Sequence, residues 1–310
     1  MFIILLILGF ILLFFGADWL VEGSKDIANR LNIPTIVIGL TLVSLGTSLP
    51  EAAVSFTAAL KGNSQISISN ILGSDILNLC IIFGAVALFP SIKALPEDIF
   101  KSTKRDILTS ALAAIILSLF MIFAGSQVLP RALGYSLLIM LAAYLLIIYR
   151  YSKNNENTED HELTLVKSLL LILLGIVAVI LGGQLVVQNS IILAKILNIS
   201  DTIIGLTIVA LGTSLPELTT SIIAAKKGEH GIAIGNAIGS NIINILLILG
   251  VSSIISPLSI NIHNIQDAII FASINIVILL YLLLKKQLKR GLGITLFLTY
   301  IAYLAFINIR

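Results

Sequence analysis

"LGTSLPE" occupies residues 45–51, and the same seven letters return at residues 211–217. Each copy ends in a glutamate and lies inside a long apolar stretch. Of the 310 residues, 58% are hydrophobic and only 11% are charged, and the mean hydropathy is +1.08. Because a soluble domain carries about 25% charged residues, this chain has too few charges to solvate its surface. The composition therefore predicts a membrane protein in which the two heptapeptides are polar exceptions.

The apolar stretches have the length and the period of membrane-spanning helices. A helix needs roughly 20 mostly apolar residues to cross the hydrocarbon core of a bilayer. Ten stretches qualify, at residues 2–24, 34–60, 66–89, 107–125, 132–151, 165–190, 202–225, 231–255, 266–284 and 292–308. We therefore expect an all-α membrane protein with ten transmembrane helices.

The repeat is larger than one heptapeptide. "IGLTLVSLGTSLPE" at residues 38–51 matches "IGLTIVALGTSLPE" at 204–217, an offset of 166. The same offset aligns "NILGSDILNL" at 70–79 with "NAIGSNIINI" at 236–245. Each half of the chain holds five of the ten stretches. Because five is odd, the two halves must enter the membrane in opposite directions, which predicts two inverted five-helix repeats and transporter architecture.

The halves are expected at residues 1–151 and 165–310, joined by a short cytoplasmic linker at 152–164. With the N-terminus outside, 15 of the 19 Lys and Arg residues fall on the cytoplasmic side and 4 on the external side. Loops rich in Lys and Arg stay in the cytoplasm. We therefore expect a multi-pass protein of the cell membrane with both termini outside.

Proline and glycine interrupt the second and the seventh expected helix. Pro50 lacks an N–H, and its ring collides with the carbonyl of Gly46 in a regular helix. Pro216 and Gly212 repeat this arrangement in the second half. Freed backbone groups survive at membrane depth only inside protein or a water-filled cavity. Both helices are therefore expected to be broken at the midplane beside a polar centre, although Ser-Leu-Pro-Glu also fits a capping box with Ser48 as the N-cap.

Two glutamates at equivalent membrane depth indicate function rather than capping alone. A charge at the centre of a membrane helix costs at least about 2.5–3.5 kcal/mol. Hydroxyl and amide side chains accompany the glutamates at helical spacing. The expected cage comprises Thr47, Ser48, Glu51, Ser74 and Asn78 from the first half and Thr213, Ser214, Glu217, Ser240 and Asn244 from the second.

These ten side chains suit hard cations. They offer twelve oxygens, four of them from carboxylates, and calcium takes about 6–8. Twelve oxygens cannot coordinate one calcium and several sodium ions together, so the ions would compete, and competition for one site is how an antiporter couples two ions. Because no His or Cys joins the cluster, zinc and copper fit poorly.

These motifs resemble the calcium/cation antiporter superfamily, specifically prokaryotic sodium/calcium exchangers. The resemblance rests on the paired heptapeptides with "GSDILN" at 73–78 and "GSNIIN" at 239–244, and it covers nearly the whole chain. It implies ten helices, of which the second, third, seventh and eighth surround the cation sites. It also implies the same ten ligands, to which it adds the backbone carbonyls of Ser44 and Ala210.

The resemblance further implies that the first and sixth spans slide to switch access. Four glycines would ease their close packing: Gly16, Gly23, Gly182 and Gly183. Some family members carry Asp where this chain has Asn78 or Asn244. With two ionised glutamates, the site charge would balance one Ca²⁺, and three Na⁺ would leave one positive charge. Exchange at the family's usual ratio would therefore be electrogenic.

The sequence thus predicts an antiporter that exchanges Na⁺ for Ca²⁺ across the cell membrane by alternating access, and not an enzyme. The expected substrates are Ca²⁺ and Na⁺ and the expected surroundings are lipid, with no cofactor and no protein partner implied. A net charge of +3 is too small to indicate nucleic acid. The closest alternative is a proton/calcium or potassium-dependent antiporter on the same scaffold. An intramembrane hydrolase with two catalytic carboxylates would leave the hydroxyls, the amides and the inversion unexplained.

Three further acidic residues have open roles. Asp75 adjoins Ser74 but lies about 100° round the helix, and its counterpart in the repeat is Asn241. It either lines an access path or makes a structural hydrogen bond. Asp18 and Glu22 are four apart on the first span, and their counterparts are glutamines. An interfacial or vestibular role is expected for them rather than ion ligation.

Overall fold

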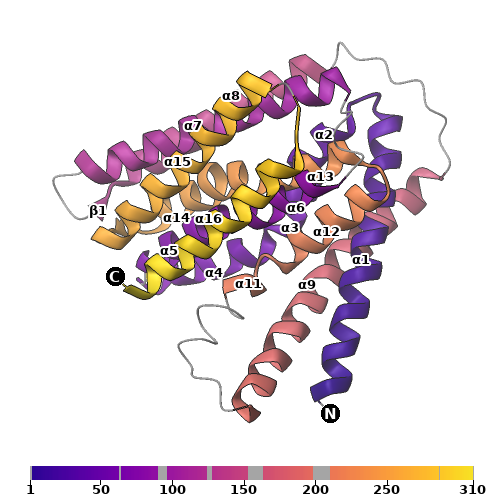
Figure 1. Cartoon of the computed structure of the whole chain (residues 1–310), viewed down its shortest axis with the longest axis horizontal. Helices are drawn as coiled ribbons and strands as arrows, with labels where there is room; N and C mark the ends of the chain where they lie inside the picture. Colours follow the sequence, from indigo (N-terminus) through magenta and orange to yellow (C-terminus); the bar gives the residue numbers. More distant parts are fainter. Residues whose placement is uncertain are drawn as a thin grey trace.

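The computed structural model describes residues 2–62, 64–89, 96–123, 128–152, 163–197, 210–285 and 287–309, and it is helical almost throughout (Figure 1). Within these ranges, eight helices are long and apolar enough to cross a membrane, or nine if one bent pair is counted as a span. The chain is therefore a multi-pass helical membrane protein, as predicted. The expected seventh span lies outside the described residues over 202–209, so the count of ten stays a prediction.

The helices follow one another with short connections. The first half contains α1 (Phe2–Arg30), α2 (Thr35–Ile38), the π-helical η1 (Gly39–Val43), α3 (Ser44–Thr47), α4 (Leu49–Leu60), α5 (Ser64–Leu77), the π-helical η2 (Asn78–Phe83), α6 (Gly84–Leu88), α7 (Glu97–Phe123) and α8 (Arg131–Ser152). The second half contains α9 (Leu165–Ile196), α11 (Ala210–Gly212), α12 (Leu215–Lys226), α13 (His230–Ile243), the π-helical η5 (Asn244–Leu249), α14 (Gly250–Ile255), α15 (Ile262–Lys285) and α16 (Arg290–Ile309).

One two-residue strand pairing joins the two halves. β1 (Val128–Leu129) follows α7, and β2 (Leu258–Ser259) follows α14. They pair antiparallel, with Val128 opposite Ser259 and Leu129 opposite Leu258. Both leucines are buried. The pairing therefore ties the connection after the fourth expected span to the connection after the eighth, although the sequence pattern did not indicate it.

The helix that carries the first heptapeptide is bent at Ser48. The helix direction changes by 52° between the segments Thr35–Thr47 and Leu49–Leu60. Ser48 has φ −83° and ψ 7°, and Ser214 has nearly the same backbone, with φ −90° and ψ 5°. In both copies the proline then occupies the first turn of the following helix, where its missing N–H is not needed. The same local sequence thus produces the same local turn.

The centre of the molecule consists of the third and eighth expected spans. Of the 18-residue apolar stretch in each of Gln65–Leu88 and His230–Ile255, 78% is buried. The corresponding share is 28% in the helices Phe2–Arg30, Arg131–Tyr151 and Arg290–Ile309. The outer helices instead present large apolar side chains, such as Phe14 and Leu298, to the surroundings. That distribution suits a protein whose solvent is lipid, because lipid tails are as apolar as leucine.

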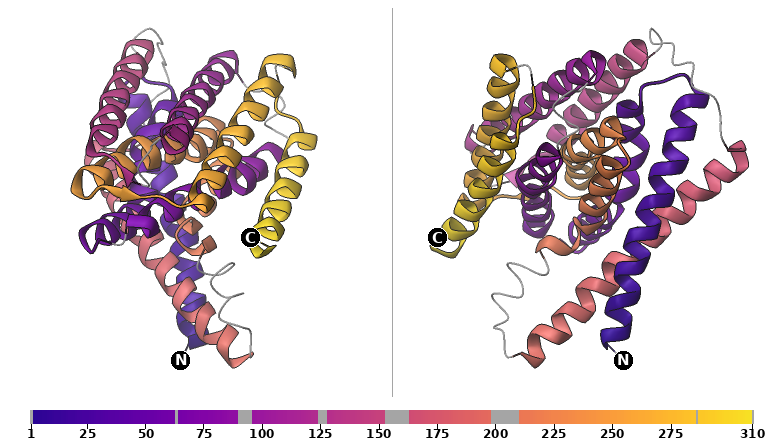
Figure 2. Two further views of the ribbon diagram at one scale, coloured as in Figure 1. Left: turned by 90° about the vertical axis from the view of Figure 1, so that its left-hand side faces the viewer. Right: turned by 45° about the vertical axis from the view of Figure 1, so that its right-hand side comes forward.

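Helices α1 and α9 form a long crossed pair beside this centre (Figures 1 and 2). A Cβ atom at Gly16 would lie 2.6 Å from the Cβ of Ala178, and one at Gly182 would lie 2.7 Å from the main-chain nitrogen of Leu13. Gly23 approaches the Ser168 carbonyl equally closely. The contacting residues occur in opposite order along α1 and α9, so the two helices are antiparallel. The expected close packing is therefore confirmed at these three glycines.

The fourth expected glycine packs elsewhere. A Cβ atom at Gly183 would lie 3.5 Å from the ring of Pro216, which is ordinary van der Waals contact. Gly183 therefore faces the break before α12 rather than α1. Both glycines of the pair Gly182 and Gly183 contribute to packing, but on opposite faces of α9.

Replacing Gly16 by valine should destabilise the protein by about 1–3 kcal/mol, because the added methyl groups would have to separate α1 from α9. Thermal unfolding of the detergent-solubilised protein would measure the loss as a lower midpoint. Gly291→Ala is the matched control, since a Cβ atom there meets nothing within 4 Å. An unchanged midpoint for Gly16→Val would contradict the tight contact.

Candidate ion-binding site

Two glutamates from opposite halves of the chain meet in the core. Glu51 lies in the first turn of α4 and Glu217 in the first turn of α12. Each has 0% of its surface exposed, and the two carboxylates are near enough to interact electrostatically. Both sit at helix N-termini, where the partial positive charge of the helix favours an anion. The geometry therefore agrees with a shared cavity and excludes a position facing lipid.

Each glutamate is held by a serine of the other half. Ser48 Oγ donates to Glu217 Oε1 at 3.0 Å, and Ser214 Oγ donates to Glu51 Oε1 at 3.4 Å. Ser74 Oγ also donates to Glu51 Oε1, at 3.2 Å, and lies 2.9 Å from Ser214 Oγ. These hydrogen bonds connect residues more than 20 positions apart and put five of the ten expected side chains in direct contact.

The capping-box interpretation is wrong for the two serine side chains. Ser48 and Ser214 occupy the N-cap positions of α4 and α12, but neither makes a side-chain cap hydrogen bond. Their hydroxyls point to the glutamates across the core instead. A hydrogen bond to a carboxylate is stronger than one to a neutral backbone group, and this explains the choice.

The two threonines lie beside the same carboxylates. Thr47 is close to Glu217, and Thr213 is close to Glu51. Thr47 Oγ1 also approaches the carbonyl oxygen of Ser44 at 3.3 Å, so that carbonyl borders the cage at the end of α3. Carbonyls at helix C-terminal ends carry partial negative charge that favours a cation. Ala210 opens α11, three residues before Thr213.

The expected amide ligands lie at the junctions between α-helix and π-helix. Asn78 is the first residue of η2, and Asn244 is the first residue of η5. Both are fully buried, as is Ser240 one turn before Asn244. Single π-turns inside α-helices frequently mark functional sites. The two junctions stand at equivalent places of the repeat, so both amides are presented from the same local geometry.

Several buried oxygens in this region have no hydrogen-bond partner within the described part of the chain. They include Oε2 of Glu51, Oε2 of Glu217, Oδ1 of Asn78, Oγ of Ser240, Oδ1 of Asn244 and Oδ2 of Asp75. Leaving a buried polar group unpaired costs about 1–3 kcal/mol, so such a group in a native protein calls for a ligand or an ion. Carboxylate, amide and hydroxyl oxygens are the ligands of hard cations. The donor set therefore fits Na⁺ or Ca²⁺.

Asp75 makes a hydrogen bond in the core rather than lining an open path. It is fully buried, and Asn244 Nδ2 donates to its Oδ1 at 2.8 Å. The contact joins α5 of the first half to η5 of the second. Of the two roles considered for Asp75, the structure supports the hydrogen bond.

A family model for the sodium/calcium exchanger protein matches residues 1–150 and 167–308. The chain belongs to the sodium/calcium exchanger family. Sodium/calcium exchanger MaX1 of Methanosarcina acetivorans is 32% identical over an alignment of 345 positions that covers 97% of each chain. A membrane protein of Methanocaldococcus jannaschii, MJ0091, is 37% identical over 309 residues, covering 96% of this chain and 95% of that one.

Solved structures agree with the sequence comparison. The structure of the sodium/calcium exchanger from Methanococcus jannaschii superposes with a TM-score of 0.83 at 32% identity, covering 98% of this chain and 97% of that chain. A structure of the exchanger NCX_Mj soaked with 10 mM Na⁺ and without Ca²⁺ superposes with a TM-score of 0.84 at 33% identity, covering 98% of each. The exchanger family is one of transporters rather than enzymes, in agreement with the sequence prediction.

Two asparagines position the glutamate helices, and the sequence analysis did not single them out. Asn236 Nδ2 donates to the main-chain oxygen of Glu217 at 3.1 Å and to Ser221 Oγ at 2.9 Å. Asn70 Nδ2 makes the equivalent hydrogen bonds, at 3.3 Å to the main-chain oxygen of Glu51 and at 3.1 Å to Ser55 Oγ. The available signal was the offset of 166, which places one asparagine on the other.

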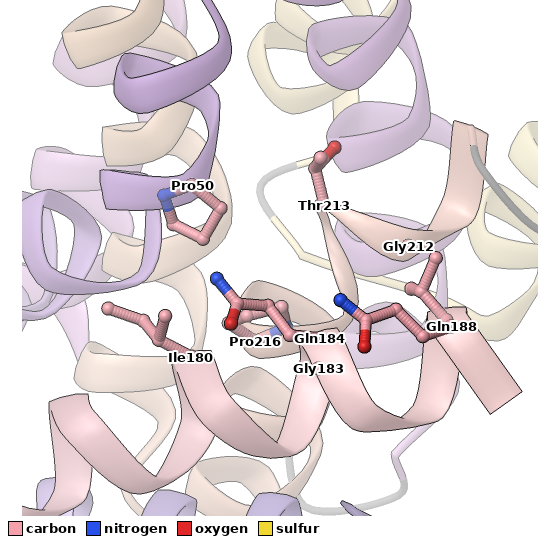
Figure 3. Close-up of a pocket in the computed structure, with 9 residues that line it drawn as sticks. Pro50, Ile180, Gly183, Gln184, Gln188, Gly212, Thr213 and Pro216 are labelled. Atoms are coloured by element: carbon pink, nitrogen blue, oxygen red, sulfur yellow. The ribbon is translucent and has the colours of Figure 1, made fainter. Parts of the chain in front are cut away.

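A pocket of about 160 Å³ opens beside the cage on the α9 side (Figure 3). The amides of Gln184 and Gln188 rise from α9 toward it, and Thr213 borders it. Its lining is Pro50, Ile180, Gly183, Gln184, Val187, Gln188, Gly212, Thr213 and Pro216. Because Thr213 belongs to the expected cage, the pocket borders that cage on the side of α9.

The equivalent side of α1 carries ion pairs instead. Asp18 Oδ1 lies 2.6 Å from Lys227 Nζ, and Lys25 Nζ lies 2.9 Å from Glu229 Oε1. Lys227 and Glu229 lie in the turn between α12 and α13. Asp18 thus makes an interfacial ion pair, in agreement with the role expected for it. The two sides of the site therefore differ, with ion pairs beside α1 and a pocket beside α9.

Replacing Asn236 by leucine should lower the free energy of unfolding by about 1–3 kcal/mol, because Ser221 and Thr47 would lose a buried hydrogen-bond partner. Thermal unfolding in detergent would measure the loss. Asn308→Leu is the matched control, since Asn308 is exposed and its amide donates to the Leu304 carbonyl of its own helix. Equal midpoints for the two variants would show that Asn236 does not hold the site.

Proposed function

We propose that this protein exchanges Na⁺ for Ca²⁺ across the cell membrane by alternating access. The observation that carries the proposal is the pair of buried glutamates, each hydrogen-bonded by a serine of the opposite half. Each also keeps one buried oxygen without a partner among the described residues. Membership of the sodium/calcium exchanger family supports the choice of ions.

The scaffold we propose has ten helices in two inverted five-helix repeats, residues 1–151 and 165–310, joined by a linker at 152–164. The linker lies mostly outside the described residues. Support comes from hydrogen bonds that recur at the offset of 166, such as those of Asn70 and Asn236. The antiparallel course of α1 and α9, the first helix of each half, agrees with inversion. We place both helix breaks at the membrane midplane and both termini outside.

The proposed ligands are all the residues of the expected cage together with two backbone carbonyls. They are Ser44, Thr47, Ser48, Glu51, Ser74, Asn78, Ala210, Thr213, Ser214, Glu217, Ser240 and Asn244. Two ionised glutamates would balance one Ca²⁺. If three Na⁺ replace it, one positive charge moves with each cycle and the exchange is electrogenic.

Access would switch when the pair α1 and α9 slides along the rest of the protein. The glycines between the two helices let them move as one body, and both helices contact the bent helices of the site. The ion pairs beside α1 and the pocket beside α9 indicate one closed and one accessible side. Sliding would exchange these roles and release the ion on the other side of the membrane.

Glu51→Gln and Glu217→Gln should each abolish calcium transport, because each removes half of the charge that balances the ion, while a buried neutral amide keeps the fold. The measurement is ⁴⁵Ca²⁺ uptake into Na⁺-loaded proteoliposomes, together with thermal unfolding of each variant. Glu97→Gln is the control, since Glu97 is 81% exposed at the start of α7. Uptake near the wild-type rate by either core variant would refute the assignment.

The coupling ion can be tested by changing the gradient. An outward Na⁺ gradient should drive ⁴⁵Ca²⁺ uptake, and an interior-positive potential should accelerate it, because three Na⁺ leaving for one Ca²⁺ entering carries charge outward. A pH gradient without Na⁺ should drive none. Uptake driven by the pH gradient would instead identify a proton/calcium antiporter on the same scaffold.

A further inference from the structure

The two halves of the site differ at one charged position. Asp75 on α5 has 0% of its surface exposed, and so has its counterpart Asn241 on α13. When residues 70–79 are aligned with residues 236–245, this is the one position where an acidic residue in the first half corresponds to a neutral residue in the second. A buried ionisable residue at membrane depth is a candidate for function, so the contacts of Asp75 are informative.

The hydrogen bond from Asn244 to Asp75 determines how the asparagine amide is turned. A carboxylate only accepts hydrogen bonds, so it takes the NH₂ side of an amide and not the carbonyl side. With Asn244 Nδ2 at 2.8 Å from Asp75 Oδ1, the carbonyl Oδ1 of Asn244 points elsewhere. That oxygen is buried and has no hydrogen-bond partner in the described chain. It is therefore presented as a ligand.

In the described chain, the equivalent amide in the other half has no hydrogen bond to a carboxylate. Asn78 is the counterpart of Asn244, and Asn241 stands where Asp75 would be. Within the described residues, neither nitrogen nor oxygen of either amide has a hydrogen-bond partner. With no hydrogen bond to fix it, the Asn78 amide can take either of two orientations, because an amide group both donates and accepts. Only the Asn244 side of the site is thus oriented by a carboxylate.

Of the two carboxylate oxygens of Asp75, Oδ1 accepts the hydrogen bond from Asn244, and Oδ2 is buried without a partner in the described chain. The position of Asp75 is about 100° round the helix from Ser74, which bonds Glu51. Among the described residues, no three acidic, His or Cys side chains come together as a metal-holding group. Asp75 is near enough to Glu51 to interact electrostatically, but the three carboxylates do not form one metal-holding group.

We propose that Asp75 is a positioning residue of the ion site, which holds the Asn244 amide with its carbonyl oxygen toward the cation. This inference rests on the proposed function, since it assigns Asn244 a cation as its ligand. Preorganised ligands bind better because less reorganisation is needed on binding. The second half would contribute a fixed oxygen at Asn244, whereas Asn78 would remain adaptable and could serve ions of different charge and number.

The test compares two substitutions of Asp75. Asp75→Leu keeps the volume but removes the acceptor, and it should raise the apparent KM for Ca²⁺ by about ten- to a hundredfold, the size of one hydrogen bond to a charged group. The rate at saturating Ca²⁺ should change little. Asp75→Asn keeps an acceptor oxygen within reach of Asn244, and its KM should stay within about threefold of wild type. The mirror control is Asn241→Leu, which should leave KM near the wild-type value.

A double-mutant cycle separates positioning from a direct charge effect. If Asp75 acts through Asn244, Asp75→Leu should raise KM no further in an Asn244→Ala background, because the amide it orients is gone. If the effects of the two substitutions multiply, or if Asp75→Asn is as impaired as Asp75→Leu, the positioning role is overturned. Asp75→Ser, too short to reach Asn244, replaces Asp75→Leu in the cycle if the leucine variant does not fold.

The result can be told apart from a failure of the proposed exchange. Ca²⁺ binding is measured independently of transport, as the rise in unfolding midpoint of the detergent-solubilised protein with Ca²⁺ concentration. A wild-type protein that binds Ca²⁺ but does not exchange it for Na⁺ would refute the proposed function alone. A wild-type protein that exchanges the ions, with Asp75→Leu unchanged in both KM and Ca²⁺-induced stabilisation, would refute the positioning role alone.

Discussion

The structure depends on keeping two carboxylates in a core that offers them no positively charged partner among the contacts described. Glu51 and Glu217 are fully buried, and each accepts a hydrogen bond from a serine that belongs to the other half. The helix N-termini beneath them supply further partial positive charge. These interactions reduce the free-energy cost of burying the two carboxylates but leave their negative charge in place. A transported cation can neutralise that charge. The turns at Ser48 and Ser214 serve this arrangement, because both serine hydroxyls reach the glutamates from them.

In the exchange we propose, a fixed part of the architecture is separate from a part that moves. The π-helical junctions at Asn78 and Asn244 lie in the most deeply buried helices. The pair α1 and α9 stands beside them, held together by glycines and in contact with the bends. A tightly packed pair moves as one body more readily than two helices move separately. In the exchange we propose, the ligands of the fixed part hold the ion while the pair changes which side can reach it.

The two halves are similar enough to build one site and different enough to give it unequal sides. Their hydrogen bonds recur at equivalent positions, as with Asn70 and Asn236. Among the differences, Ser74 bonds Glu51 whereas its counterpart Ser240 has no partner in the described chain, and Asp75, which orients Asn244, has a neutral counterpart. One rigid and one adaptable amide would suit a site that must take Ca²⁺ and Na⁺ in turn, because the two ions differ in charge and in number.

The amino-acid sequence by itself determined the membrane class, the helices and the candidate ligands. Apolar length, proline position and the offset of 166 are local or repetitive properties, and they need no knowledge of packing. Only the tertiary structure decided which partners meet. Ser48 bonds Glu217 instead of capping α4, and Asp75 bonds Asn244, in each case across 169 residues. Such contacts depend on how two halves are placed against each other, and no spacing within either half contains that information.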